Sequence, residues 1–243
     1  MLADLFFDLD RTLWDFDRNS REALHEIFLE LAQSKLPSGF TPEAFIAVYE
    51  VENERCWKAY REGTLTQQQL RPLRFKRSVE KLGILDFEGM DELAEAMGEA
   101  YVKRAPFRTG LCEGAMEVCE VLHARGHRMF ILTNGFEEVQ HIKMQNSGLE
   151  PFFQRVLTSD ALGFKKPKID AFEQSIALTD SSPSNAIMIG DDMECDVQGA
   201  LDAGWSAIHF DPHGKGSPAK GTRGERAFKR IANLRELLDL PLS

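Results

Sequence analysis

The sequence lacks the features that mark several specialised classes of protein. Its 4 cysteines include no closely spaced pair, which argues against a disulfide scaffold and predicts free thiols in a reducing compartment. No uncharged apolar run approaches the roughly 20 residues that a membrane helix needs, and the first residues carry no secretory leader pattern. Acidic residues outnumber basic ones, and the net charge of -10 opposes binding to a nucleic acid polymer or an anionic membrane. We therefore expect a cytoplasmic protein whose partners are small molecules.

The composition is otherwise that of an ordinary folded protein. The chain has 243 residues, 43% of them hydrophobic and 28% charged, so it fits one domain or one domain with a large insertion. It contains no internal repeat and no low-complexity tract. It also shows no heptad seam, and it leaves the oligomeric state open.

Short apolar segments and amphipathic segments alternate over the C-terminal part of the chain. The pattern predicts strands at residues 128–132, 155–157, 186–189 and 205–210, separated by helices at residues 115–124, 138–146, 169–178 and 197–203. Single helices between strands make right-handed crossovers, so these segments and a first strand within residues 1–12 predict a doubly wound parallel α/β sheet of the Rossmann-like kind. A surface loop at 212–226 and a last helix that starts with the Asn233 capping box complete this part.

A long N-terminal segment shows helical periodicity and almost no strand pattern. Thr41 followed by Pro42 predicts one helix start, and we expect four or five helices over the whole segment. The economical architecture is an α/β core of residues 1–13 and 107–243, interrupted by an all-helical cap domain of residues 14–106.

Two aspartates follow the first predicted strand. Leu5-Phe6-Phe7 is apolar, and Asp8 and Asp10 come next with one residue between them. Alternate residues at a strand end point the same way, so the two carboxylates lie side by side and the pKa of one of them rises. One carboxylate can then stay ionised as a nucleophile while the other carries a proton. A solvated polar turn is the alternative interpretation of this segment on its own.

Three further segments carry polar residues that suit a phosphoryl group or a metal ion. Thr133 and Asn134 offer a hydroxyl and an amide, and Lys166 lies in a loop before a predicted helix. Asp191 and Asp196 follow an apolar strand, and such hard oxygen ligands suit Mg²⁺. Because open α/β sheets place their sites at the carboxyl ends of strands, we expect these side chains to converge. Each segment alone also fits an ordinary turn or surface loop.

Taken together, the four segments resemble the four motifs of the haloacid dehalogenase superfamily, and specifically its phosphatases with a helical cap inserted after the first motif. The motifs are matched by Asp8-Leu9-Asp10-Arg11-Thr12, by Thr133-Asn134, by Lys166-Pro167, and by Gly190-Asp191 with Asp196. The residues around Asp8 and the step from Asp191 to Asp196 are similar to those of pyrimidine 5′-nucleotidases and N-acylneuraminate 9-phosphatases. The chain departs from the pattern at Arg11, where many relatives carry glycine, and the paired Lys165-Lys166 leaves the register open by one residue.

The resemblance implies a mechanism. Asp8 would be the nucleophile that forms an aspartyl-phosphate, and Asp10 would be the general acid and then the general base. Mg²⁺ would be held by Asp8, by the Asp10 backbone carbonyl and by Asp191.

The resemblance also implies how the phosphoryl group is held. Thr133, Asn134 and Lys166 would bind its oxygens. Asp196 would orient Lys166 or a metal-bound water. Thr12, the last residue of the first motif, would lie behind the residues that contact the substrate.

The resemblance implies a Mg²⁺-dependent phosphomonoester hydrolase for small phosphorylated metabolites, with nucleoside 5′-monophosphates first. Trp14 and Phe16 follow the nucleophile, and they would stack on a base or pack the foot of the cap. The alternative substrates are sugar phosphates or sugar-acid phosphates. A phosphomutase would use the same residues. A 2-haloacid dehalogenase would not need Asp10, and a non-catalytic phospho-binding module usually loses the nucleophile or a metal ligand.

Overall fold

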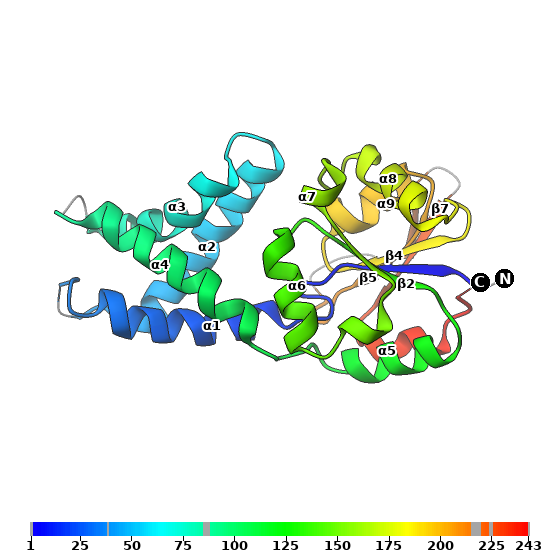
Figure 1. The fold of residues 1–243 in the computed structure, drawn as a ribbon, viewed down its shortest axis with the longest axis horizontal. Coiled ribbons are helices and arrows are strands. Elements are labelled where there is room, and N and C mark those ends of the chain that lie inside the picture. The colour runs from blue at the N-terminus through cyan, green and yellow to red at the C-terminus, as the bar shows by residue number, and fades with distance from the viewer. Residues whose placement is uncertain (1, 38, 85–87, 215–219, 224–225, 243) are drawn as a thin grey trace. The chain divides into compact units, whose positions relative to one another are not determined.

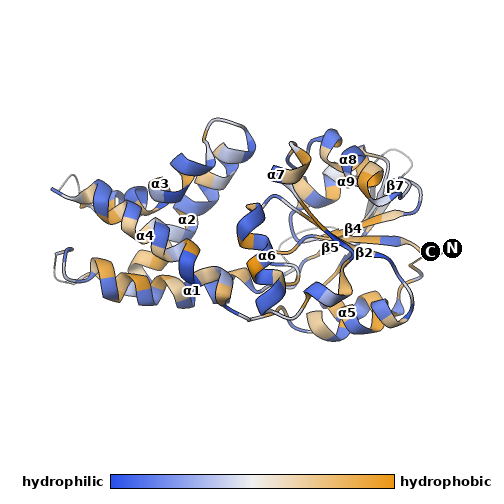
Figure 2. Cartoon of the chain, viewed as in Figure 1, coloured by the Kyte–Doolittle hydropathy of each residue, from blue (hydrophilic) through white to orange (hydrophobic). Residues whose placement is uncertain are grey.

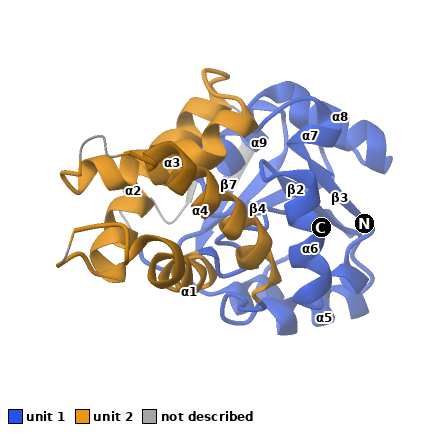
Figure 3. Ribbon diagram, turned by 60° about the vertical axis from the view of Figure 1, so that its left-hand side comes forward, with its two compact units in different colours: residues 1–16, 109–243 blue, residues 17–108 orange. Residues whose placement is uncertain are grey.

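The computed structural model divides the chain into two compact units, which Figure 3 shows in separate colours. The first unit comprises residues 1–16 and 109–243, and the second comprises the insertion, residues 17–108. The predicted boundaries at residues 14 and 106 lie close to these. The described residues are 2–37, 39–84, 88–214, 220–223 and 226–242.

A seven-stranded sheet with the order β3-β2-β1-β4-β5-β7-β6 lies in the first unit (Figure 1). Its strands are β1 (Asp4–Phe7), β2 (Met129–Thr133), β3 (Arg155–Thr158), β4 (Ala186–Gly190), β5 (Ser206–Phe210), β6 (Lys220–Arg223) and β7 (Arg226–Ile231). Six of these strands run parallel, and β6 at the edge runs antiparallel to β7. The predicted class, a parallel α/β sheet with a helical insertion after its first strand, is confirmed.

The edge of the sheet differs from the prediction. The segment 212–226 is predicted as a loop, but its residues Lys220–Arg223 form β6, and β7 is a strand that the sequence does not predict. Residues 215–219 and 224–225 of that segment lie outside the described residues. Glycines and charged residues favour a turn here locally, whereas the two strands form by pairing with β5 and with each other.

Helices cover both faces of the sheet (Figure 1). They are α5 (Ala115–Ala124), α6 (Glu137–Asn146), α7 (Ser159–Leu162), α8 (Ile169–Thr179) and α9 (Gly199–Asp202), with a π-helical turn at Met193–Gln198 and 3-10 helices at Glu150–Phe152 and Leu234–Asp239. Leu5 and Phe7 belong to the core shared with α5 and α6, and Phe6 belongs to the core shared with α8 and α9. This alternation is that of a strand buried on both faces.

The last predicted helix is a short 3-10 helix instead of an α-helix. Its capping box is present, because the Asn233 side chain accepts from the Arg235 N–H at 2.9 Å and Glu236 accepts from the Asn233 N–H at 2.9 Å. The cap residues are therefore readable from the sequence, whereas the helix type is not.

An aromatic cluster fills the core on the side of α8 and α9. The ring centroid of Trp205 lies 4.6 Å from that of Phe6 and 5.1 Å from that of Phe172. Phe6 also stacks on Phe130 at 4.9 Å. These rings join β1, β2, α8 and the start of β5, so the cluster holds the central strands against one helical layer.

The second unit is all helical. Its helices are α1 (Phe16–Ile27), α2 (Pro42–Arg61), α3 (Gln67–Lys81) and α4 (Met90–Arg104), with a π-helical turn at Phe28–Ala32 and a 3-10 turn at Ala105–Phe107. The predicted start of α2 is confirmed, since the Thr41 side chain accepts from the Ala44 N–H at 3.2 Å with Pro42 in the first helical position. Polar and apolar residues alternate along these helices (Figure 2), and their apolar residues form a separate core. Among the described residues, we find no helix with the length and apolar character needed to cross a membrane.

A short antiparallel pair lies where the chain leaves the first unit and returns to it. Residues 13–15 pair with residues 110–112 through a bridge between Trp14 and Leu111 and through backbone hydrogen bonds of 2.8 and 3.0 Å. We call these residues the stem. Because the stem lies within the first unit, that unit holds both ends of the insertion by its own hydrogen bonds.

The aromatic cluster predicts a large stability effect for Trp205. We expect Trp205→Ala to lower the free energy of unfolding by about 3–5 kcal/mol, because the change leaves a void among rings that cannot close up. Urea unfolding followed by far-UV circular dichroism measures the loss. Leu178→Ala, on the same layer but 43% exposed, is the control and should change stability by less than about 0.5 kcal/mol. Equal losses in the two variants would contradict the role of the cluster.

Candidate active site

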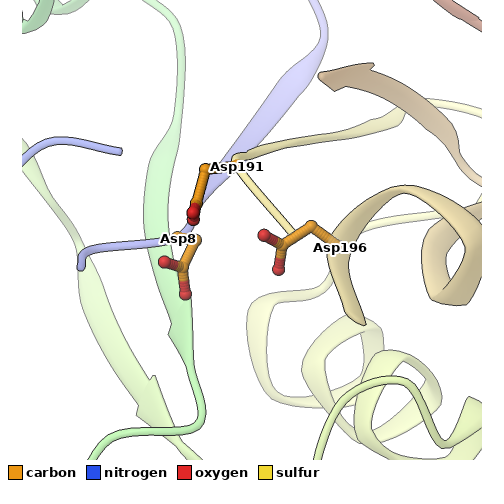
Figure 4. Close-up of side chains that lie close together, drawn as sticks. All are labelled: Asp8, Asp191 and Asp196. Atoms are coloured by element: carbon orange, nitrogen blue, oxygen red, sulfur yellow. The ribbon is translucent and has the colours of Figure 1, made fainter. Parts of the chain in front are cut away.

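Three acidic side chains meet at the carboxyl end of two neighbouring strands. Asp8 follows β1, Asp191 follows β4, and Asp196 lies in the π-helical turn after β4. One oxygen of each carboxylate lies within 4.8 Å of the others. Figure 4 shows the three side chains around one space. Because β1 and β4 pair directly, the sheet topology is what brings residues so far apart in sequence together.

The Lys166 ammonium brings a positive charge to this point. It is buried and donates to Asp8 Oδ1 at 2.7 Å, to Asp196 Oδ1 at 2.6 Å and to the Leu132 carbonyl at 2.7 Å. These three acceptors use all three N–H bonds of the ammonium. Lys165, the other residue open in the predicted register, is only partly buried, so the structure places Lys166 at the site.

The Asn134 side chain holds the backbone of Lys166. Its Oδ1 accepts from the Lys166 N–H at 2.8 Å, and its Nδ2 donates to the Lys166 carbonyl at 2.9 Å. Both ends of the amide are therefore engaged with one residue. In this arrangement the Asn134 side chain positions Lys166, and its contact with a phosphoryl oxygen stays a prediction.

The aspartates in the segment after β4 have different partners. Asp192 caps the π-helical turn, since its Oδ1 accepts from the N–H groups of Glu194 and Cys195 at 2.9 Å each. The Asp196 carboxylate accepts from Lys166 and, through Oδ2, from the Asp192 N–H at 3.1 Å. Gly190 is required beside it, because a Cβ at this position would overlap the Asp196 carboxylate. The carboxylates of Asp191 and Asp196 both lie close to that of Asp8.

Burial raises the pKa of each acid in the cluster. Desolvation is the largest cause at Asp8, where the Lys166 charge opposes it and the nearby Asp196 adds to it, and the pKa of Asp8 is raised to about 7. The pKa values of Asp191 and Asp196 are also raised, first by desolvation. The pKa of Lys166 is raised despite its burial, because Asp196 and Asp8 stabilise the charged form. The three carboxylates therefore outweigh the positive charges of Lys166 and of Arg11, whose guanidinium acts on Asp191.

This imbalance fits a divalent cation. The cluster contains three carboxylates and one ammonium, and its free ligand atoms are hard oxygens of the kind that Mg²⁺ prefers. Both oxygens of Asp196 accept hydrogen bonds from within the chain, so Asp8 and Asp191 are better placed to hold the ion.

A second polar group lies beside the acids and includes two residues that the sequence analysis does not single out. Asp10 Oδ1 accepts from Lys143 Nζ at 2.6 Å, and Asp10 Oδ2 accepts from Gln140 Nε2 at 3.0 Å. Gln140 Nε2 also donates to Thr133 Oγ1 at 2.8 Å. Gln140 and Lys143 lie on the buried face of α6, where apolar residues are expected, so no sequence pattern marks them.

The remaining predicted residues lie close to this group. Thr12 is buried, and its hydroxyl donates to Asp191 Oδ1 at 3.5 Å. Trp14 is fully buried with the Lys143 ammonium 4.3 Å from its ring centroid, so its ring is packed against the protein instead of open to a nucleotide base. Phe16 is partly exposed, and the Arg11 guanidinium lies 4.7 Å from its ring centroid. Arg11 has a φ of 64, the left-handed region in which glycine is free of strain.

Comparisons with known proteins agree with this geometry. Residues 5–204 match the family model described as haloacid dehalogenase-like hydrolase. The chain is 28% identical to the pyrimidine 5′-nucleotidase YjjG of Escherichia coli over 88% of each chain. It is 33% identical to the ribulose-1,5-bisphosphate 5-phosphatase of Halopiger xanaduensis over 99% of each chain. The crystal structure of YfnB from Bacillus subtilis bound to magnesium superposes with a TM-score of 0.81 at 26% identity, covering 98% of this chain and 97% of that one.

The buried acids predict that Mg²⁺ stabilises the protein in a pH-dependent manner. Because the folded-state pKa of Asp8 lies above the usual value near 4, its protonated form favours folding at low pH, and this contribution is lost as the pH rises through about 7. Mg²⁺ can replace the proton, so its addition should raise the melting temperature more at about pH 8 than at about pH 5.5. Differential scanning fluorimetry measures the shift. A shift that is equal at both pH values, or unchanged in Asp191→Asn, would contradict the proposed ligands.

Proposed function

The chain belongs to the haloacid dehalogenase-like hydrolases, and we propose that it is a Mg²⁺-dependent phosphomonoester hydrolase that acts through an aspartyl-phosphate intermediate. The observation that carries the proposal is the position of Asp8. Its carboxylate lies at the end of a central strand, bound to the Lys166 ammonium and next to Asp191, with the Asp10 carboxylate held two residues further on. A nucleophile, a cation to neutralise the phosphoryl group, a metal ligand and a proton donor are thereby assembled in one unit.

In the first step, an oxygen of Asp8 attacks the phosphorus atom of the substrate. The bond between phosphorus and the leaving oxygen breaks as the bond to Asp8 forms, and Asp10 gives its proton to the leaving oxygen, which departs as an alcohol. The Lys166 ammonium, which binds Asp8 directly, stabilises the negative charge on the phosphoryl oxygens.

In the second step, a water molecule attacks the phosphorus atom of the aspartyl-phosphate. Asp10, now ionised, takes a proton from this water, the bond between phosphorus and Asp8 breaks, and inorganic phosphate leaves. Asp8 returns as a carboxylate and Asp10 as an acid, so both residues are ready for another turnover. When bound, Mg²⁺ would neutralise charge between Asp8, Asp191 and the phosphoryl group.

For the substrate we propose small phosphorylated metabolites, with nucleoside 5′-monophosphates first. The support comes from relatives named as pyrimidine 5′-nucleotidases, in Escherichia coli and in Streptococcus pneumoniae, at 28% and 27% identity. The buried position of Trp14 removes one source of base recognition, whereas the Phe16 side chain is partly exposed.

Sugar phosphates are the second candidate class. The ribulose-1,5-bisphosphate 5-phosphatase of Halopiger xanaduensis matches a larger share of the chain and at a higher identity than the nucleotidases do. Both classes carry a phosphate on the C5 oxygen of a five-carbon sugar, so they differ in the rest of the molecule.

Asp8 provides the direct test of the mechanism. We expect Asp8→Asn to lower kcat for phosphate release by at least about 10³-fold while the protein stays folded, because an amide cannot form the aspartyl-phosphate. The measurement is steady-state phosphate release with Mg²⁺, with circular dichroism to check folding. Asp239→Asn, at an exposed aspartate, is the control and should keep wild-type activity. Full activity in Asp8→Asn would exclude this nucleophile.

The substrate class is tested by comparing kcat/KM values. We expect uridine and thymidine 5′-monophosphates to exceed ribose 5-phosphate, ribulose 1,5-bisphosphate and a sugar-acid phosphate by at least about 10-fold, the effect of one good contact to a base. If a sugar phosphate is hydrolysed as well as the nucleotides or better, the nucleotidase assignment fails and the phosphatase assignment remains.

A further inference from the structure

Helix α6 presents two buried polar residues to the acid–base residue. Gln140 is 0% exposed and Lys143 is 5% exposed, and they lie three positions apart on one face of the helix. Together they bind both carboxylate oxygens of Asp10, at 3.0 and 2.6 Å. The Asp10 side chain itself is 27% exposed, so it is held from behind while it remains accessible. Neither helix residue belongs to the four motifs.

Gln140 connects Asp10 to the hydroxyl that is placed to bind phosphate. Its Nε2 donates to Asp10 Oδ2 and also to Thr133 Oγ1, at 3.0 and 2.8 Å. The amide nitrogen, which only donates hydrogen bonds, lies within hydrogen-bond distance of both acceptors. A Cβ at Gly135 would overlap the Gln140 side chain, so a glycine at this position makes room for the connection.

The same contacts orient the Thr133 hydroxyl. Thr133 Oγ1 accepts from Gln140 and also from the Gly135 N–H at 3.1 Å. A hydroxyl has two acceptor positions and one hydrogen, so two accepted bonds leave that hydrogen to be donated elsewhere. Thr133 ends β2 at the carboxyl edge of the sheet, so in the proposed mechanism this hydrogen is available to a phosphoryl oxygen.

Lys143 fixes the other oxygen of Asp10. Its ammonium lies 2.6 Å from Asp10 Oδ1 and 4.3 Å from the ring centroid of Trp14, and the side chain is 6% exposed. A buried ammonium held between a carboxylate and an aromatic face has little freedom to move. Each oxygen of Asp10 keeps a second lone pair, which remains for the proton that is transferred.

We propose that Gln140 and Lys143 are positioning residues that hold the Asp10 carboxylate, and through Gln140 the Thr133 hydroxyl, in the geometry that phosphoryl transfer requires. The proposal rests on the phosphatase activity proposed above. A 1 Å displacement of a proton donor is enough to slow a reaction strongly, so the helix that carries these residues contributes to catalysis without touching the substrate.

The test uses Lys143→Met and Gln140→Met, which keep most of the apolar bulk of each side chain and remove its hydrogen bonds. First-turnover release of the leaving group is measured with a nucleoside 5′-monophosphate and with p-nitrophenyl phosphate, whose leaving group departs without a proton. We expect each variant to slow the nucleotide reaction by about 10- to 100-fold and the p-nitrophenyl reaction much less. Gln145→Ala, on the exposed face of the same helix, is the matched control and should behave as wild type.

Two further readouts separate positioning from a purely structural role. In an Asp10→Asn background, Lys143→Met should change the first-turnover rate by less than about 2-fold, because its partner carboxylate is already gone. Gln140→Met should in addition weaken inhibition by inorganic phosphate, since the Thr133 hydroxyl is no longer oriented, whereas Lys143→Met should not.

The possible outcomes are distinct. Wild-type rates in both methionine variants, or equal slowing of both substrates in both backgrounds, would overturn the positioning role and leave the phosphatase assignment intact. If circular dichroism shows that a methionine variant is not folded, Lys143→Arg or Gln140→Glu replaces it. Because Lys143→Arg keeps a positive charge beside Asp10, the positioning role then requires that this variant keep part of the wild-type nucleotide rate. A wild-type protein with no phosphatase activity on any substrate would overturn the proposed function, and the positioning role with it.

Discussion

One buried ammonium holds the site together. Lys166 donates to Asp8 after β1, to the Leu132 carbonyl in β2 and to Asp196 after β4, so a single side chain joins the ends of three adjacent parallel strands. Asn134 in turn fixes the backbone of Lys166 from both sides. The loop that carries Lys166 is therefore ordered by contacts with the sheet, and the sheet ends are ordered by the lysine.

The same cluster explains why a protein would retain so costly an arrangement. Burying three carboxylates near one ammonium raises the pKa of each acid, and such a group weakens the folded state when it is fully ionised. Acids with raised pKa values of this kind are found at functional sites. The repulsion among them destabilises the folded protein, and binding a cation or a proton relieves that repulsion. The site is built for its ligands at the expense of the empty state.

The sequence predicts those parts of the site that lie directly at strand ends. Asp8, Thr133 and Asp191 stand at or directly after the ends of apolar strands. The sequence locates this edge of the sheet because a run of apolar residues is enough to predict a buried strand. Gln140 and Lys143 are different: on a helix, glutamine and lysine ordinarily indicate a solvent-facing side, and only the tertiary structure shows that they face Asp10. The role of the Asn134 side chain also depends on a partner 32 positions away. The sequence does not predict the strand β7 for a related reason: the strand forms by pairing with β5, and its own residues do not indicate it.

The stem has a consequence for how such a protein can change over evolution. Residues 13–15 and 110–112 close the insertion by pairing with each other, so the rest of the first unit meets the same two ends whatever lies between them. The entropy lost on closing a loop grows only with the logarithm of its length, about 0.6 kcal/mol for each doubling. Helices can therefore be added to the insertion, removed from it or exchanged at little thermodynamic cost to the sheet. A lineage can explore new substrates in one unit while the residues that perform the chemistry in the other stay under separate selection.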